Sequence, residues 1–196
     1  MNHNTLSAFD RIAPWYEPFM TFFFLKRDRV LLSLIQPQGH ERVLDVGAGT
    51  GRFGKILAPL CLSITLVDES ERMLSRLSSK ESHLEVLVGD IFSLHLPSDH
   101  YDWIVLSDVL HHLSHFERLF PLLARLLKDQ GKILIHEYTP NHWTTRWLGF
   151  FERRLFGPLD FKDMDQMKKA IQPWFELEQI ENKRGWYIMV AKKKGA

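Results

Sequence analysis

The sequence predicts an α/β fold in which helices cover both faces of a mostly parallel sheet. Short apolar runs alternate with segments of helical character from Val43 to Glu137, and this alternation is typical of parallel strands joined by right-handed crossovers. The last two predicted strands, Phe175–Glu181 and Trp186–Lys192, are separated by the short link Asn182–Gly185. So short a link requires an antiparallel hairpin. We therefore expect a doubly wound parallel sheet that ends in one antiparallel strand.

The composition is that of an ordinary globular protein. With 196 residues the chain is long enough for one domain with a substantial core, and we expect a single domain over residues 1–196. The net charge of +1 provides no general attraction for nucleic acid. The one cysteine, Cys61, excludes an internal disulfide and is compatible with a reducing compartment. No cysteine pattern suggests zinc, so we expect no metal, and the composition leaves the oligomeric state open.

The first 38 residues form an addition before the sheet. Met1–Ser7 is polar, which argues against a signal peptide, so a cytoplasmic location is expected. Pro18–Leu25 is strongly apolar, but the charged run that begins at Lys26 interrupts it well short of the roughly 20 residues that a bilayer span needs. Arg29–Ile35 then has the character of a helix, which Pro37 ends.

A glycine-rich loop follows the first strand. Val43–Val46 is apolar enough for a buried parallel strand, and Gly47, Gly49 and Gly51 come directly after it. Arg52–Cys61 has helical character until Pro59 disturbs its end. A strand, a glycine loop and a helix start together form a nucleotide-cofactor site, because the first backbone N–H groups of a helix attract an anion, either a phosphate or a carboxylate.

Two interpretations of this loop compete. Gly49, Gly51 and Gly54 have the G-x-G-x-x-G spacing of dinucleotide-binding proteins. Asp45 and the glycines at 47, 49 and 51 instead form D-x-G-x-G-x-G. A carboxylate at the strand end would repel a pyrophosphate, but it suits a cationic ligand.

The second pattern resembles motif I of the class I S-adenosylmethionine methyltransferases, and the resemblance extends over residues 40–138. It implies a Rossmann-like doubly wound seven-stranded sheet of order 3-2-1-4-5-7-6, with strand 7 antiparallel, and S-adenosyl-L-methionine as the cofactor. It also implies that the loop holds the methionine end of the cofactor through Asp45, Gly47, Ala48, Gly49 and Gly51.

The ends of the next two strands continue this resemblance. The strand Ser63–Val67 ends in Asp68 and Glu69, where the family binds the ribose hydroxyls, and Asp68 is the main candidate. Leu84–Val88 is followed by Asp90 and Ile91, which match the positions that contact adenine. Ser70 is expected to cap a short helix that carries Met73, and Met73 either touches adenine or belongs to the core.

The fourth and fifth strands introduce the candidates for chemistry. Tyr101–Leu106 leads into Ser107 and then Val109–Leu113, which is similar to the V-L-H-H-L segment of the ubiquinone/menaquinone-type methyltransferases. Ser107 is a candidate cofactor contact. His111 and Glu137, at the ends of strands four and five, are candidates for the base that takes the acceptor's proton; alternatively, they orient the loop through hydrogen bonds.

The helix and turn between these two strands are predicted from spacing. Ser114 is expected to cap a helix from Phe116 to Leu127, whose apolar residues recur at helical intervals. Leu126–Gly131 is similar to the family's L-x-P-G-G turn, although Gln130 stands where a glycine is common. The fifth strand is then expected over Lys132–His136.

Two aromatic segments are expected on the substrate side. Phe9–Tyr16 looks like the F-D-x-x-A-x-x-Y entry of the quinone-type enzymes, which implies an N-terminal helical lid over residues 1–38 with Tyr16 near the methyl donor; Tyr16 could equally pack a helix on the domain. Residues 139–172 form an aromatic insertion in which Trp143, Trp147 and Phe150 share a helical face. This face could line a substrate pocket, contact a membrane or pack on the domain. A further helix is expected over Asp163–Ile171.

These features predict a methyltransferase that acts on a small, apolar or aromatic molecule by in-line displacement. A different class, a S-adenosylmethionine-binding partner or regulatory module without catalysis, is the alternative. An NAD(P) oxidoreductase is the third hypothesis, and it requires nicotinamide binding. The acceptor is expected to be neither nucleic acid nor protein, and peripheral membrane contact stays open.

Overall fold

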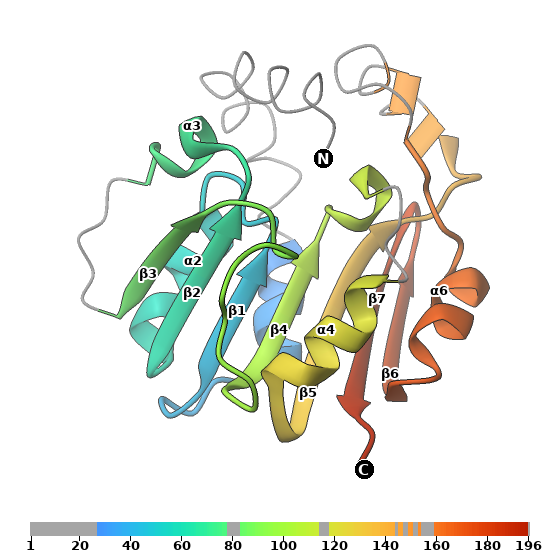
Figure 1. The fold of residues 1–196 in the computed structure, drawn as a ribbon. Coiled ribbons are helices and arrows are strands. Elements are labelled where there is room, and N and C mark those ends of the chain that lie inside the picture. The colour runs from blue at the N-terminus through green and yellow to red at the C-terminus, as the bar shows by residue number, and fades with distance from the viewer. Residues whose placement is uncertain are drawn as a thin grey trace.

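The computed structural model describes residues 27–77, 83–113, 118–143, 145–146, 149–150, 153 and 159–195. Within these residues a central sheet has helices packed on both faces (Figure 1). Its strands are β1 (Arg42–Val46), β2 (Ser63–Asp68), β3 (Leu84–Val88), β4 (Tyr101–Ser107), β5 (Leu127–Tyr138), β6 (Phe175–Lys183) and β7 (Trp186–Lys193). Its helices include α2 (Arg52–Leu57), α3 (Glu71–Leu74), α4 (Leu119–Leu126) and α6 (Met164–Ile171), with short 3₁₀ turns at Ala58–Leu60 and Leu110–His112.

The sheet has the predicted topology. Its seven strands lie in the order β3-β2-β1-β4-β5-β7-β6. Strands β1 to β5 pair in parallel, whereas β7 runs antiparallel to both β5 and β6. The carboxyl ends of the parallel strands therefore share one edge, at the top of Figure 1. The order reverses between β1 and β4, and ligands of open α/β sheets bind at such a point.

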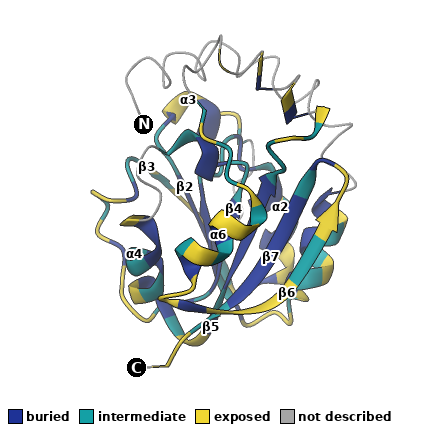
Figure 2. Cartoon of the chain, turned by 90° about the vertical axis from the view of Figure 1, so that its right-hand side faces the viewer, coloured by how far each residue is buried: buried dark blue, intermediate teal, exposed yellow. Residues whose placement is uncertain are grey.

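The core consists of two apolar layers, one on each face of the sheet. Helical residues 27–35 and α2 contribute Leu31, Ile35, Phe53 and Leu57 to one layer. Helices α4 and α6 contribute the other layer, which includes Leu119, Phe120, Leu123, Met167 and Ile171. Figure 2 shows the result: β7 is buried except at its two ends, while the edge strand β6 carries exposed residues.

Local signals set most of the element ends. Pro59 lies in the 3₁₀ turn that ends α2, as predicted. Asp163 caps α6 through a capping box with Gln166, in which each side chain accepts from the other residue's backbone N–H. Gly185 has φ 89° and closes the hairpin between β6 and β7. Each of these signals acts within a few residues along the chain.

The boundary between α4 and β5 differs from the prediction. Leu127 was expected to end the helix, and the strand was expected to begin at Lys132. Instead, α4 ends at Leu126, and Leu127 begins β5 by pairing with Tyr101 of β4. Gln130 keeps a left-handed φ of 68°, and the register between β4 and β5 shifts between Tyr101 and Trp103. The buried Leu127 side chain extends the strand through the segment that was expected to form a turn.

Several predicted features lie outside the described residues. These are Tyr16 with the rest of the expected N-terminal lid before residue 27, the predicted cap Ser114 with Phe116, and Trp147 in the aromatic insertion. Within the described part of the chain, no helix combines the length and the apolar character required to cross a membrane.

Candidate active site

The glycine-rich loop between β1 and α2 adopts a conformation that needs glycine. Gly47, Gly49 and Gly51 all have left-handed φ values, of 70°, 57° and 70°. The backbone N–H groups of Gly47 and Ala48 both donate to Val67 O, at 2.8 and 3.0 Å, which ties the loop to β2. A Cβ at Gly47 would lie 2.3 Å from Val109 Cγ2. The loop is therefore fixed closely against its neighbours.

Asp68, at the end of β2, holds the far side of this loop. Its Oδ2 accepts from Gly49 N at 2.7 Å, and its Oδ1 accepts from Ser70 N at 2.9 Å. Ser70 Oγ in turn accepts from Met73 N at 3.2 Å and so caps α3, as predicted. Met73 is buried, and its methyl carbon lies 3.5 Å from the position a Cβ of Gly49 would take. The structure thus gathers the loop, Asp68 and Met73 in one place.

Asp45 lies buried at the end of β1, next to Asp68. Burial is the main cause that raises the pKa of Asp45 to about 7, and the negative charge of Asp68 raises it further, against the opposing effect of Arg27. Two carboxylates held this close would gain from a nearby positive charge. They would repel the pyrophosphate of a dinucleotide. The two carboxylates consequently fit a cofactor that carries a sulfonium and an α-ammonium group.

The outer strand ends supply the remaining cofactor candidates. Asp90 follows β3, and its Oδ1 accepts from Phe92 N at 3.0 Å, while Ile91 is buried. Glu69 follows Asp68 and is partly exposed. The strand order places Asp90, Asp68 and the glycine loop in succession along the carboxyl edge of the sheet.

A buried ion-pair network joins the helical residues 27–35 to this edge. Arg27 pairs with Asp108, which follows β4. Asp28 pairs with Arg52 at the start of α2, with Nη2 and Oδ1 2.8 Å apart. Arg27 and Asp28 are both buried. Sequence reasoning missed this network, because the run from Lys26 to Arg29 was interpreted as an interruption of an apolar stretch.

Asp108 also contacts His136 at the end of β5. Asp108 has φ 58°; its backbone N donates to His136 O at 3.1 Å, and its Oδ1 lies 2.8 Å from His136 Nδ1. Burial alone would raise the pKa of Asp108, but Arg27 and His136 hold it well below its ordinary value. Ser107 Oγ lies 3.5 Å from the same Nδ1. The signal that could have indicated Asp108 is its position immediately after β4, at the ligand-binding edge.

A second acid–imidazole pair contains both predicted catalytic residues. His111 Nδ1 and Glu137 Oε2 lie 2.8 Å apart, and both side chains are buried. Glu137 Oε1 also accepts from Leu110 N at 2.8 Å. The ring of His111 stacks on Phe161, with centroids 4.6 Å apart. Both oxygens of Glu137 thus contact the segment that follows β4.

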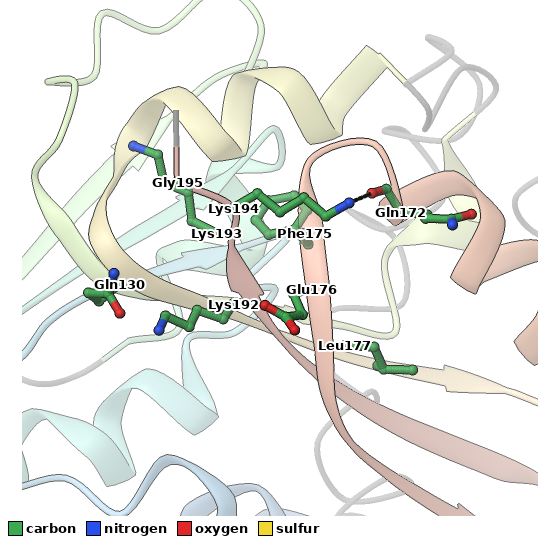
Figure 3. A pocket seen from close by; sticks show the side chains of 9 residues that line it. All are labelled: Gln130, Gln172, Phe175, Glu176, Leu177, Lys192, Lys193, Lys194 and Gly195. Atoms are coloured by element: carbon green, nitrogen blue, oxygen red, sulfur yellow. Dashed lines mark hydrogen bonds between the residues drawn. The ribbon is translucent and has the colours of Figure 1, made fainter.

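An open cavity of about 680 Å³ lies at the other end of the sheet (Figure 3). It is lined by the start of β6 and the end of β7, and Lys194 Nζ donates to Gln172 O there at 2.6 Å. The glycine loop and the predicted site residues lie at the opposite edge. The cavity is therefore separate from the site described above.

Comparisons with known proteins agree with this geometry. Residues 44–135 match the family model described as "Methyltransferase domain". The chain is 23% identical over 185 residues to the demethylmenaquinone methyltransferase of Tropheryma whipplei, covering 88% of this chain and 77% of that protein.

Solved structures share the fold at low sequence identity. A Haloferax volcanii chain solved in a complex with the Trm112 methyltransferase activator has a TM-score of 0.85 and 14% identity, covering 95% of this chain and 98% of that one. A SAM-dependent methyltransferase of Thermotoga maritima has a TM-score of 0.78 and 18% identity, covering 97% and 100%. The domain match over residues 44–135, the strand order and the acidic glycine loop show that the chain contains a class I S-adenosylmethionine-dependent methyltransferase domain, and the chain is similar to the enzymes of the ubiquinone/menaquinone type.

Proposed function

We propose that this methyltransferase acts on a small aromatic molecule of the quinol class. The observation that carries the proposal is the set of aromatic rings beside the two acid–imidazole pairs. The ring centroids of Tyr138 and Trp186 lie 5.7 and 5.3 Å from the ring centroid of His136, and the ring of Phe161 stacks on that of His111. Aromatic walls of this kind suit a flat apolar acceptor. The relative named as a demethylmenaquinone methyltransferase acts, by its name, on such a molecule.

The proposed cofactor contacts follow the strand ends. Asp45 and the loop residues Gly47, Ala48, Gly49 and Gly51 are proposed to hold the methionine end. Asp68 and Glu69 are proposed to hold the ribose. Met73, Asp90, Ile91 and Ser107 complete the proposed set. The left-handed glycines and the buried Asp45 support this assignment, since the loop admits close approach and the carboxylate favours a cation. Tyr16 stays a prediction, because it lies outside the described residues.

The chain's part in catalysis is alignment and proton removal. When bound, S-adenosylmethionine supplies an electrophilic methyl group on sulfur. A rigid loop and flanking strand ends fix the methyl donor relative to the acceptor, and alignment of this kind can contribute roughly 7–11 kcal/mol. For His111 and Glu137 we favour the positioning role, since both oxygens of Glu137 are already engaged with Leu110 and His111.

The aromatic insertion is proposed to form part of the substrate side. Trp143 is 73% exposed and Phe150 is 68% exposed, so neither is packed in the core. Exposed apolar surface of this kind is found where a protein contacts a ligand, a partner or a lipid surface. This supports the interpretation that the 139–172 segment meets an apolar acceptor, with or without a membrane beside it.

Turnover with a defined acceptor tests the proposal. Purified protein is incubated with S-adenosylmethionine and a naphthoquinol that lacks the ring methyl, under dithionite so that the acceptor stays reduced. We expect S-adenosylhomocysteine release and a singly methylated product in the mass spectrum. Gly49→Val is the control, because a β-branched side chain at φ 57° distorts the loop and should abolish cofactor binding. Cofactor binding without any turnover would refute the proposed acceptor and favour the non-catalytic alternative.

A further inference from the structure

We infer that His136, oriented by Asp108, accepts the proton that the methyl acceptor loses. The inference rests on the proposed function and deepens it. His136 lies at the carboxyl end of β5 and is 1% exposed. Its Nδ1 lies 2.8 Å from Asp108 Oδ1, in an ion-pair contact, and 3.5 Å from Ser107 Oγ. Its other ring nitrogen, Nε2, is buried with no hydrogen-bond partner among the described residues.

Asp108 is held so that it can fix one tautomer of this imidazole. Its left-handed backbone and the bond from its N–H to His136 O attach it to the end of β5. Its other carboxylate oxygen pairs with the guanidinium of Arg27. A neutral ring that donates from Nδ1 to Asp108 leaves the lone pair of Nε2 available for a proton.

The surroundings of His136 suit proton transfer from an aromatic hydroxyl. Tyr138, from the same strand, and Trp186, from β7, flank the ring. The charged groups on this side are Asp108 and, behind it, Arg27. The hydroxyl of Ser107 lies 3.5 Å from the Nδ1 of the same ring. A buried base without a bonded partner is costly unless a ligand supplies the proton that it lacks.

His111 differs in the way it is held. Its Nδ1 faces Glu137, whose other oxygen accepts from Leu110 N, and its ring stacks on Phe161. Its backbone carbonyl accepts from Asp160 N at 3.0 Å. These contacts join the segment after β4 to β5 and to the residues before α6. His111 thus has the contacts of a structural residue, and it serves as the matched control for His136.

The proton balance of the proposed step is simple. The acceptor hydroxyl gives its proton to Nε2, and the electron pair of the resulting quinolate forms the bond from its ring carbon to the methyl carbon. The bond between methyl and sulfur breaks, with its electrons left on sulfur. The ring carbon then passes its hydrogen, as a proton, to the oxygen, which restores the quinol. His136 returns one proton to solvent for each methyl transferred.

The first test compares His136→Gln with His111→Gln in steady-state turnover of the naphthoquinol. Removal of a general base is expected to lower kcat about 10²–10⁴-fold. The KM for the acceptor and the Kd for S-adenosylhomocysteine should change less than about threefold, because the loop and strand ends are intact. His111→Gln should lower the urea midpoint, and it should lower kcat at least tenfold less than His136→Gln does, because His111 positions the segment after β4 and takes no proton. A His136→Gln variant that folds and retains a third of the wild-type kcat would overturn the inference.

The second test needs no acceptor. Nitrogen-15 NMR of the histidine rings, with the protein bound to S-adenosylhomocysteine, reports which nitrogen carries the proton. We expect His136 to be neutral with its proton on Nδ1, and Asp108→Asn to remove this preference. Asn suits the left-handed backbone at 108, so this variant should fold. A proton on Nε2 of the wild type would overturn the inference, whatever the acceptor. If the naphthoquinol is not methylated but Nδ1 carries the proton, the proposed acceptor fails and the role of His136 is supported.

Discussion

Replacement of Asp45 by Asn is expected to stabilise the protein and to weaken its binding of the cofactor. The carboxylate is buried beside Asp68, and its pKa is raised from 3.8 to about 7 by burial first and by Asp68 second. The isosteric amide removes the charge and keeps the shape of the side chain. A native carboxylate that costs stability in this way indicates a group selected for ligand binding.

The magnitude follows from the linkage between protonation and folding. A pKa higher in the folded than in the unfolded state adds stability below the unfolded pKa, and this stability is lost as pH rises through about 7. A shift of about 3 pKa units corresponds to about 4 kcal/mol once the group is fully ionised. The free energy of unfolding of Asp45→Asn, relative to that of the wild type, should therefore rise by about 3 kcal/mol between pH 5 and pH 8.

Urea denaturation of the cofactor-free protein at pH 5, 6.5 and 8 measures this difference. Asp129→Asn is the matched control: that side chain is 91% exposed, so its free energy of unfolding should stay within about 0.5 kcal/mol of the wild type at each pH. Calorimetry should show that wild-type protein binds S-adenosylhomocysteine more tightly at pH 8 than at pH 5, because the ammonium group favours ionised Asp45. Asp45→Asn should lose this pH dependence. If the difference in the free energy of unfolding between Asp45→Asn and the wild type is equal at pH 5 and pH 8, the reasoning is refuted.

Four further substitutions test the local signals at the glycine loop, at Gln130 and at the start of α6. Gly47→Ala should destabilise the fold by about 2–4 kcal/mol, because its Cβ would meet Val109 at 2.3 Å in a left-handed conformation, whereas Gly49→Ala should cost only about 1 kcal/mol; equal urea midpoints would contradict this. Gln130→Gly should stabilise by up to about 1 kcal/mol in thermal unfolding, since it relieves φ 68°; a lower Tm would argue against strain there. Asp163→Ala should cost about 1 kcal/mol through the lost capping box and leave S-adenosylhomocysteine affinity unchanged; altered affinity would mean that α6 is coupled to the site.

The sequence predicted the sheet because its signals are local or follow a fixed topology. The short link before Trp186 required a hairpin, and the hairpin distinguishes this sheet from that of an ordinary dinucleotide-binding domain. The glycines at 47, 49 and 51 indicated a cofactor-binding loop, and the structure gives all three a left-handed backbone. The beginning of β5 was mispredicted because the pairing of Leu127 with Tyr101 depends on a neighbouring strand.

The chemistry at the sheet edge was only partly accessible from the sequence. Parallel strands bring their carboxyl ends together by rule, so Asp45, Asp68 and Asp90 could be nominated from their positions alone. Which acid faces which imidazole follows from register instead. Ser107 is aligned with His136 across β4 and β5, and this alignment brings Asp108 against His136 while Glu137 turns to His111. Adjacent residues of a strand point to opposite faces, and a one-residue slip would exchange these partners.

By itself the sequence determined the fold class, because this depends on the alternation of strands and helices and on periodicity within short segments. The strand order and the cofactor followed from the resemblance of its motifs to those of the class I methyltransferases. Only the tertiary structure decided how the charges pair. Arg27 and Asp108 are 81 positions apart, and they meet because a helix before the sheet packs on the face where β4 ends. Electrostatic pairing depends on distance and burial in three dimensions, and neither quantity is encoded in the spacing of residues along a chain.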